Sequence, residues 1–387
     1  MNIQKRVLPW TFPGYTPDLH IAPADWFALL ARFSWLRALD GVPQDATYHA
    51  EGDVLRHTQM VVQSLPALSG WRTLAEADRP QLFAAALLHD TGKSSCTVVE
   101  ADGRITTHGH ARRGEQLARC VLWLGEELEA PVPFLVREKI AALVRLHGLP
   151  LQFLEKADPA SAVIEASLRV RLDHLALLAE ADVRGRTCVD QHALLERIAL
   201  FRDYCQEQNC YTHPRAFASA YSRFVYVQGD HSDPAYVAYD DTCCEVVVMS
   251  GLPGAGKDSW IRTNLPDWPV ISLDGVRREL GISPGGEQGR VAQVARERAR
   301  VFLRRQCSFI WNATNVTRMM RQRIIDLACA YRARVRIVYV ESPYAVLLSR
   351  NRVRQASVPE ELLSRLLRKL EVPQLGEAQQ VEWIWSE

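Results

Sequence analysis

The apolar run VVVM at residues 246–249 is followed by Ser250 and then by the glycine-rich stretch GLPGAGKDS at residues 251–259. A run of β-branched residues predicts a buried strand, and the following SWIRTNL has the spacing of an amphipathic helix. The glycines permit backbone conformations and close approaches that other residues resist. Their spacing, G-x-x-x-x-G-K, is that of a P-loop, in which backbone N–H groups surround phosphates at a helix N-terminus. The sequence therefore predicts a strand, a phosphate-binding loop and a helix in direct succession.

The predicted loop implies a nucleoside triphosphate as ligand, ATP or another NTP, and gives its residues distinct tasks. Lys257 is expected to bridge the β- and γ-phosphate oxygens as a point charge. Asp258 stands where a serine or threonine usually follows this lysine, so we expect either Asp258 or Ser259 to ligate Mg²⁺. A glycine turn without a ligand is the alternative. The predicted nucleotide-binding residues are Gly251, Gly254, Ala255, Gly256, Lys257, Asp258 and Ser259.

Near residue 227, both the predicted secondary-structure pattern and the net charge of the chain change. Its 387 residues suffice for about two or three domains. We expect an N-terminal extension and an all-α domain over 1–226, a polar linker over 227–243 and an α/β domain over 244–387. Residues 244–387 carry 22 Lys and Arg against 15 Asp and Glu, a net charge of +7, whereas residues 1–243 carry 24 against 30, a net charge of −6. A basic half suits a polyanionic partner, although an ordinary basic surface has the same composition.

Composition and patterning predict a cytoplasmic protein. Lys5 and Arg6 are followed by VLPWTFPGY, which two prolines interrupt, so no signal peptide is expected. No run approaches the ~18 apolar residues that span a bilayer, and we expect no membrane partner. Nine cysteines without a C-x-x-C pair argue against a disulfide framework and a thiolate zinc site. These patterns predict neither an oligomeric state nor a role for residues 1–45.

Residues 244–387 alternate between strand-like and helical segments. The predicted strands are Glu245–Met249, Val270–Leu273, Ser308–Trp311 and Val335–Val340. Such alternation predicts a parallel sheet covered by helices, with ligands at the carboxyl ends of the strands. The first half is instead almost wholly helical in pattern. Its predicted helical segments are Ala24–Leu39 and residues 54–65, 81–90, 111–124, 137–148 and 171–183.

Histidines and aspartates recur in the helical part at positions where apolar residues would be expected. His147 and Asp182, for example, each complete an apolar face with the spacing i, i+3, i+4, i+7. Polar groups on buried faces must be satisfied, and imidazoles that converge with carboxylates are what a metal site provides. Any one of these histidines alone is better explained as a core or capping residue with one hydrogen bond. The whole series is His57, His89, Asp90, His110, His147 and Asp182.

The ordered series H, HD, H, H, D resembles that of the HD phosphohydrolase superfamily. The local sequences YHAEGDVLRHT around His57, LLHDTGKS around His89, HGHARRG around His110 and AEADVRG around Asp182 carry the resemblance over residues 45–190. The resemblance implies an all-α HD domain that binds one or two divalent transition metals and hydrolyses phosphate esters.

The resemblance also implies how these residues divide between two metals, with Asp90 as the bridge. Two carboxylates and two divalent cations leave a net positive charge that attracts a phosphate ester. Lys93, one turn beyond Asp90, is a candidate phosphate contact or leaving-group acid, and His49 and His108 are candidate auxiliary ligands. The implied ligand sets are His57, His89, Asp90 and Asp182 for one metal, and Asp90, His110 and His147 for the other.

Charged residues also follow the predicted strands of the second half. Asp274 ends one strand, and Arg277 and Arg278 come directly after it. A carboxylate can deprotonate an acceptor hydroxyl while an arginine holds the neighbouring phosphate. A helix cap and a basic helix face would explain the same residues equally well. Asn312 stands where an acidic residue would hold Mg²⁺ through water, and we expect Asp258 to supply that missing charge.

A polar break between two later helical segments carries Arg350, Arg352 and Arg354. A lid arginine placed over the triphosphate would stabilise charge on the transferring phosphoryl group, whereas a basic helix surface is the competing interpretation. The stretches GLPGAGKDSW, SLDGVRREL, NATNVTR and SRNRVR together resemble the P-loop polynucleotide kinases. The order of the two halves is similar to that of the bacterial HD-domain polynucleotide kinases.

The combined resemblance implies an enzyme that heals broken RNA or DNA ends. Its kinase would phosphorylate 5′-hydroxyl ends with an NTP, and its HD domain would remove 2′,3′-cyclic or 2′-phosphates, leaving ends that a ligase can seal. The residues by themselves indicate only a metal phosphohydrolase joined to a nucleotide-dependent phosphotransferase. Two alternatives stay open: a kinase for a small-molecule acceptor such as a nucleoside, sugar or antibiotic, and a nucleotide switch that gates the hydrolase without transferring phosphate.

Overall fold

The computed structural model describes residues 10–19, 22–283, 286–353 and 357–386. The chain divides into two compact units, Met1–Ala216 and Phe217–Glu387. The division falls at residue 216 rather than at the expected residue 226, because helix α13 (Ala220–Gln228) packs on the second unit. Phe224 of this helix belongs to the core of that unit, and Arg223 donates to the carbonyl oxygen of Gln379 at 3.0 Å. Residues 229–243, within the expected linker, form no helix or strand.

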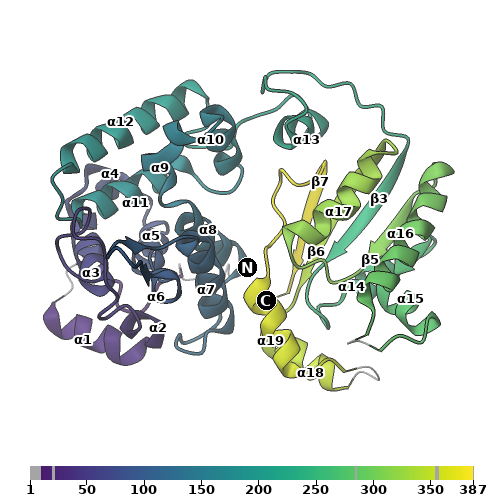
Figure 1. Cartoon of the computed structure of the whole chain (residues 1–387), viewed down its shortest axis with the longest axis horizontal. Helices are drawn as coiled ribbons and strands as arrows, with labels where there is room; N and C mark the ends of the chain where they lie inside the picture. Colours follow the sequence, from purple (N-terminus) through teal and green to yellow (C-terminus); the bar gives the residue numbers. More distant parts are fainter. Residues whose placement is uncertain (1–9, 20–21, 284–285, 354–356, 387) are drawn as a thin grey trace, which may run out of the picture. The chain divides into compact units, whose positions relative to one another are not determined.

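The first unit is built almost entirely from helices (Figure 1). Each of the five segments predicted between residues 54 and 183 overlaps a helix of the structure, with bounds that differ by up to three residues. The predicted segment Ala24–Leu39 forms two helices, because Phe33 has an extended backbone and a fully buried ring between them. The elements are α1 (Pro23–Arg32), α2 (Ser34–Arg37), α3 (Val54–Ser64), η1 (Leu65–Ala67), α4 (Ser69–Thr73), α5 (Arg79–Leu88), α6 (Lys93–Cys96), β1 (Val98–Val99), β2 (Ile105–Thr106), α7 (His110–Leu124), α8 (Phe134–Leu146), α9 (Leu149–Gln152), η2 (Phe153–Glu155), α10 (Pro159–Ser167), α11 (Leu172–Arg184) and α12 (Gln191–Glu207).

Helix α5 lies at the centre of this unit. Its residues Leu82 to Leu88 have no exposed surface, and the helix packs against α3, α8 and α11. A helix that is apolar on all sides is stable only when it is surrounded in this way. Because α5 ends at Leu88, it delivers the following polar pair, His89 and Asp90, into the interior.

Gly92 permits the turn after Asp90 to approach α7 closely. A Cβ atom at Gly92 would lie 2.0 Å from the carbonyl oxygen of His110 and 2.7 Å from the backbone nitrogen of Gly114. No residue with a side chain fits this space, since real Cβ atoms do not approach other atoms so closely. The glycine therefore brings the first residue of α7, His110, towards Asp90.

The second unit contains a five-stranded parallel sheet with strand order β4-β5-β3-β6-β7 (Figure 1). All four predicted strands are present, and β7 is an additional edge strand that was not predicted. Helix α17 packs against β3 and β6, and α16 packs against β4. The elements after α13 are β3 (Cys244–Ser250), α14 (Lys257–Asn264), β4 (Val270–Ser272), α15 (Leu273–Glu279), α16 (Gln288–Arg304), β5 (Phe309–Asn312), α17 (Arg318–Cys329), β6 (Ala333–Glu341), α18 (Tyr344–Arg352), α19 (Glu360–Lys369) and β7 (Gln380–Trp385).

Strand β3 occupies the middle of the sheet, between β5 and β6. Its residues Val246 to Met249 are fully buried, as expected for a central parallel strand covered on both faces. Because the strands are parallel, the loops that follow β3, β4, β5 and β6 lie along one edge. Within the described part of the chain, no helix combines the length and apolar character needed to cross a membrane.

Candidate functional sites

The predicted histidine and aspartate series converges at one place in the first unit. His57 Nε2 on α3 lies 3.0 Å from Asp182 Oδ1 on α11 and 3.8 Å from Asp90 Oδ2. His89 Nε2 lies 3.3 Å from the same Asp90 oxygen. These four side chains are almost completely buried. We call this group of ligand atoms the His57 position.

The second oxygen of Asp90 faces two further histidines. His110 Nε2 lies 3.7 Å and His147 Nε2 lies 3.8 Å from Asp90 Oδ1, and the two Nε2 atoms are 3.4 Å apart. This second group, the His147 position, therefore shares only Asp90 with the His57 position. A carboxylate whose two oxygens face separate sets of imidazoles has the arrangement needed to bridge two cations.

Three of the histidines are held in one tautomer by their own turns. His89, His110 and His147 each direct Nδ1 at a main-chain carbonyl three residues earlier, and a carbonyl can only accept a hydrogen bond. Each Nδ1 is therefore protonated, which leaves Nε2 with a free lone pair towards Asp90. The acceptors are the carbonyl oxygens of Ala86, Thr107 and Val144, at 2.7, 2.8 and 2.8 Å.

Burial and neighbouring charges set the protonation of these groups. Burial lowers the pKa of His147 to about 4, so its imidazole is neutral near pH 7 and can act as a ligand. Burial opposes ionisation of Asp90 and Asp182, but Lys93 beside the first and Arg186 beside the second hold both pKa values well below the usual range. The two carboxylates are therefore ionised.

Two cations of the chain contact these carboxylates directly. Lys93 Nζ lies 2.7 Å from Asp90 Oδ2 and donates to Gln44 Oε1 at 2.8 Å. Arg186 donates to both oxygens of Asp182, at 3.0 and 2.6 Å. Lys93 was a predicted site residue, whereas Gln44 and Arg186 were not. Arg186 follows Asp182 by four residues, just beyond the end of α11, and this spacing is the sequence signal that could have identified it.

The residues present fit divalent cations. Among the described residues, His57 Nδ1, His57 Nε2, His89 Nε2 and Asp90 Oδ1 are buried atoms without a hydrogen-bond partner, and such atoms are costly unless a ligand satisfies them. The ligand atoms of His57, His89 and Asp90 lie within 4.8 Å of one another, and so do those of Asp90, His110 and His147. Imidazole and carboxylate donors suit transition metals such as Mn²⁺, Fe²⁺, Co²⁺, Ni²⁺ or Zn²⁺. Of the two candidate auxiliary histidines, His49 contacts Glu51 next to this cluster, whereas His108 is exposed.

The glycine-rich loop joins β3 to α14 in the second unit. Gly251, Gly254 and Gly256 have φ values of +140°, +83° and +104°, which side chains rarely adopt. A Cβ atom at Gly251 would also lie 2.3 Å from the carbonyl oxygen of Val340. Both the conformation and the neighbouring strand therefore require glycine at this position, and the loop ends at the N-terminus of α14.

Lys257 and Asp258 make specific contacts at the start of α14. Lys257 Nζ donates to the carbonyl oxygens of Gly251 and Leu252, at 2.8 and 2.9 Å, so the ammonium group lies over the loop. Asp258 Oδ1 accepts from Asn312 Nδ2 at 2.7 Å. The two residues that were predicted to compensate for one another are therefore in contact, while Ser259 is exposed and accepts from Arg262.

The arginines that were considered as lid residues differ in their position relative to the loop. Arg350 donates to the carbonyl oxygen of Gly254 at 3.3 Å and to Ser342 Oγ at 3.0 Å, so its guanidinium group lies beside the loop. Arg352 instead pairs with Glu360, away from the loop. Arg354 lies outside the described residues.

Asp274 and its two neighbouring arginines lie on α15, directly after β4. Asp274 is largely exposed and forms an ion pair with Arg277, which also donates to Gln288 Oε1. Arg278 is exposed on the same helix. Because Ser272 at the end of β4 is in register with Asn312 at the end of β5, Asp274 follows the same sheet edge as the Asn312–Asp258 contact.

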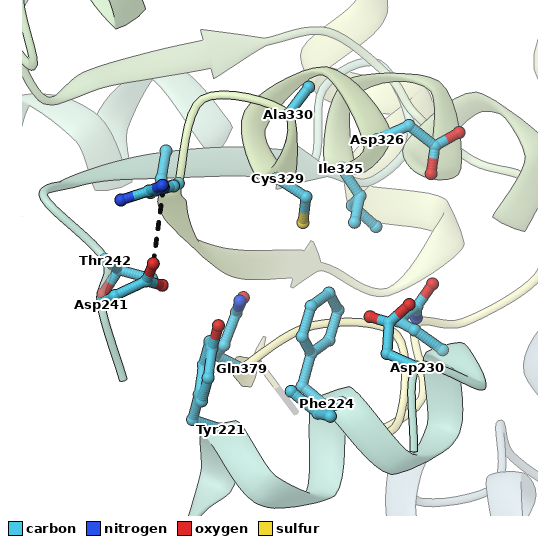
Figure 2. Close-up of a pocket in the computed structure, with 14 residues that line it drawn as sticks. Tyr221, Phe224, Asp230, Asp241, Thr242, Ile325, Asp326, Cys329, Ala330 and Gln379 are labelled. Carbon is cyan, nitrogen blue, oxygen red and sulfur yellow. Dashed lines mark ion pairs between the residues drawn. The ribbon is translucent and has the colours of Figure 1, made fainter. Parts of the chain in front are cut away.

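A cavity of about 510 Å³ lies elsewhere in the second unit (Figure 2). It is lined by α13, α17 and the segments that precede β3 and β6, at the amino ends of these strands. Its lining includes Asp230, Asp241 and Asp326, and Arg332 pairs with Asp241 at 3.4 Å. The excess of carboxylates makes this cavity unsuitable for a triphosphate, so we place the nucleotide at the glycine-rich loop.

The fold and the loop together define a P-loop domain in the second unit. A family model described as an AAA domain matches residues 246–373, which include most of β3, the loop and the strands β4 to β6. This match agrees with a nucleotide-binding domain of the P-loop kinase type.

Two curated relatives, both multifunctional CCA proteins, are similar to part of this chain. The protein from Ralstonia nicotianae is 32% identical over 46% of this chain and 39% of its own length. The protein from Mannheimia succiniciproducens is 30% identical over 43% of this chain and 38% of its own length. The chain thus spans about two fifths of the length of these relatives. A solved structure of a candidate kinase from Chloroflexus aurantiacus aligns with a TM-score of 0.32 and 14% identity, over 37% of this chain and 89% of that one.

Proposed function

We propose that this chain is a bifunctional enzyme that heals nucleic-acid ends. Its first unit would remove 2′,3′-cyclic or 2′-phosphates as an HD phosphohydrolase, and its second unit would phosphorylate 5′-hydroxyl ends with an NTP and Mg²⁺. A functional association with a ligase follows, since the products are the ends that a ligase joins. The observation that carries the hydrolase is Asp90, whose two oxygens face two separate sets of imidazoles.

Charge supports a phosphate ester as the substrate of the first unit. Three carboxylates, Glu51, Asp90 and Asp182, stand against two cations, Lys93 and Arg186, which leaves a charge of −1 in the cluster. Two divalent cations would change this charge to +3, and bound cations would polarise the ester and lower the pKa of water. Lys93 and Arg186 would hold phosphate oxygens, and Lys93 would donate a proton to the leaving oxygen.

In the second unit, the roles proposed for the residues at the loop are supported by their contacts. The loop glycines and Lys257 would hold the phosphates of the NTP, and Asp258 would ligate Mg²⁺ with Asn312 fixing its orientation. Asp274 would act as the general base towards the acceptor hydroxyl. Arg277 or Arg278 would hold the acceptor phosphate, and Arg350, beside Gly254, would stabilise charge on the transferring group.

The kinase is tested by following label from γ-³²P-ATP. Label on a 5′-hydroxyl oligonucleotide is the expected result, and Asp274→Ala should abolish it while nucleotide binding is kept. Label on a nucleoside, sugar or antibiotic alone would assign a small-molecule acceptor. Label found only as free phosphate would indicate a nucleotide switch and contradict transfer.

The hydrolase is tested with an oligonucleotide that ends in a 2′,3′-cyclic phosphate. Asp90→Ala should abolish hydrolysis and leave the kinase unchanged, because the two sets of residues lie in different units. Loss of both activities in a folded Asp90→Ala protein would contradict two independent sites. RNA and DNA versions of the 5′-hydroxyl oligonucleotide, assayed in parallel, establish which nucleic acid the kinase prefers, whereas the cyclic-phosphate substrate needs a terminal ribonucleotide.

A further inference from the structure

Glu51 was not a predicted ligand, yet its carboxylate is in contact with the proposed metal site. Its side chain is 1% exposed, and Oε1 lies 2.8 Å from both His49 Nδ1 and His57 Nδ1. The contact with His49 is a hydrogen bond, whereas the contact with His57 brings the negative charge close to a ring nitrogen that has no hydrogen-bond partner among the described residues. Its other oxygen accepts from the backbone N–H of Thr187 at 2.8 Å. His57 thus differs from His89, which directs Nδ1 at a carbonyl of its own helix.

These contacts form a closed ring through the His57 position. Glu51 contacts His57 Nδ1, His57 Nε2 contacts Asp182 at 3.0 Å, and Asp182 is held by Arg186. The next residue, Thr187, returns to Glu51 through its N–H, and its carbonyl oxygen accepts from Ala50 N at 2.9 Å. The ring therefore ties the segment before α3 to the segment after α11.

The ring does not include the His147 position. His110 and His147 are oriented by carbonyls of their own turns and contact Asp90 Oδ1. A change at Glu51 should therefore disturb one group of ligands and spare the other.

We propose that Glu51 is the positioning residue that orients His57 as a ligand of the cation at the His57 position, and that His49 shares this carboxylate without being a ligand. A carboxylate on the far nitrogen of a metal-binding imidazole fixes its tautomer and increases the basicity of the ligating nitrogen. The proposal rests on the proposed metal site of the first unit. If Glu51 has this role, the affinity for a divalent cation can be changed at the His57 position without a change at the His147 position.

The test compares Glu51→Gln with His49→Gln in the full chain. Metal-free protein is titrated with Mn²⁺ by calorimetry and with Co²⁺ by visible absorption, without any substrate. Glutamine has the size of glutamate, but it removes the negative charge and replaces one accepting oxygen with a donor, so it cannot present an oxygen to both His57 Nδ1 and the N–H of Thr187. We expect two binding events in the wild type, and in Glu51→Gln a loss of about 10–100-fold in one of them.

The second binding event and its Co²⁺ absorption should stay unchanged in Glu51→Gln, a selectivity that general destabilisation would not produce. His49→Gln should keep both affinities within about twofold, since loss of an outer residue that is not a ligand leaves the metal bonds intact. If His49→Gln loses one metal, the cluster of His49, Glu51 and His57 is itself a cation site, and the positioning role is refuted.

Two further outcomes separate this proposal from the proposed function. Wild-type affinities at both positions in Glu51→Gln would refute the positioning role and leave the metal site intact, whereas a wild-type chain that binds no divalent cation would refute both. If Glu51→Gln does not fold, Glu51→Asp serves instead, because it keeps the charge but is one methylene shorter. Two unchanged affinities in Glu51→Asp would likewise refute the positioning role.

Discussion

Replacement of Gly92 by alanine tests how the His147 position is assembled. Gly92 has φ −63° and ψ −24°, so alanine is conformationally allowed there and only space excludes it. The added Cβ would lie 2.0 Å from the carbonyl oxygen of His110, whereas ordinary contacts begin at 3.4 Å. The backbone of His110 must therefore move by about 1.4 Å, or the turn after Asp90 must move by the same amount.

A movement of this size is large compared with what metal ligation tolerates. Histidine–metal bonds are ~2.0–2.1 Å long, and ligand positions are specified within ~0.2 Å. We expect Gly92→Ala to weaken binding of the cation at the His147 position by ~10–100-fold, as loss of a residue that orients a ligand would. Crowding costs ~1–3 kcal/mol, and the stiffer unfolded chain returns ~0.4–1 kcal/mol, so the free energy of unfolding should fall by ~1–2 kcal/mol.

Calorimetric titration with Mn²⁺, urea unfolding and hydrolysis of a 2′,3′-cyclic phosphate end measure these effects. Gly148→Ala is a matched control, since Gly148 adjoins His147, has φ −79°, and its added Cβ would find no atom closer than 3.8 Å. The control should bind Mn²⁺ as the wild type does, and kinase activity should be normal in both variants. If Gly92→Ala keeps the Mn²⁺ affinity and the hydrolysis rate of the wild type, the close approach of Gly92 to α7 is not what positions His110 as a ligand.

Three further predictions concern single groups. Lys257→Ala should weaken NTP binding by ~10–100-fold, since a phosphate-binding charge is lost, and equilibrium dialysis with labelled ATP checks this; equal binding would place the phosphates elsewhere. Asp258→Ser should raise the Mg²⁺ concentration needed for phosphoryl transfer, and unchanged Mg²⁺ dependence would exclude Asp258 as the compensating ligand. Burial by itself would raise the pKa of Glu138, but the neighbouring Arg119 and Arg137 outweigh this effect and lower the pKa from 4.5 to about 2. The ionised carboxylate therefore contributes about 3 kcal/mol, complete above pH ~4.5 and lost as the pH falls towards 2. Glu138→Gln should show a flatter loss of stability over that interval in acid unfolding, and an unchanged slope would contradict the assignment.

Local patterns predicted much of the architecture. The glycines of the P-loop were identified because their positive φ values and close contacts leave no other choice, as Gly251 illustrates. The five helices around the histidine series were predicted because their apolar spacing follows the buried face. Strand β7 was missed because its sequence, QVEWIW, alternates polar and apolar residues, with Ile384 and Trp385 exposed, and so gives no clear apolar run.

Contacts between distant segments could not be predicted in the same way. Glu51 lies six residues before His57 in a loop, and only folding brings it next to Thr187. Arg352 shares a polar segment with Arg350, but an ion pair with Glu360 directs it elsewhere. Asn315 adopts a positive φ of 43°, and nothing in NATNVTR indicates that its side chain supports the strand before the P-loop.

The buried guanidinium of Arg321 has a consequence for the order in which the second unit is completed during synthesis. Asn315 Nδ2 donates to the carbonyl oxygen of Met249, and Ser250 Oγ donates to the carbonyl oxygen of Asn315. Arg321 also donates to that oxygen and forms a bidentate pair with Glu377. Until Glu377 is available, the guanidinium group of Arg321 has no carboxylate partner, and burying it unpaired would cost ~3–5 kcal/mol. The glycine-rich loop, although it begins at residue 251, thus reaches its final form only after the segment that carries Glu377 has left the ribosome.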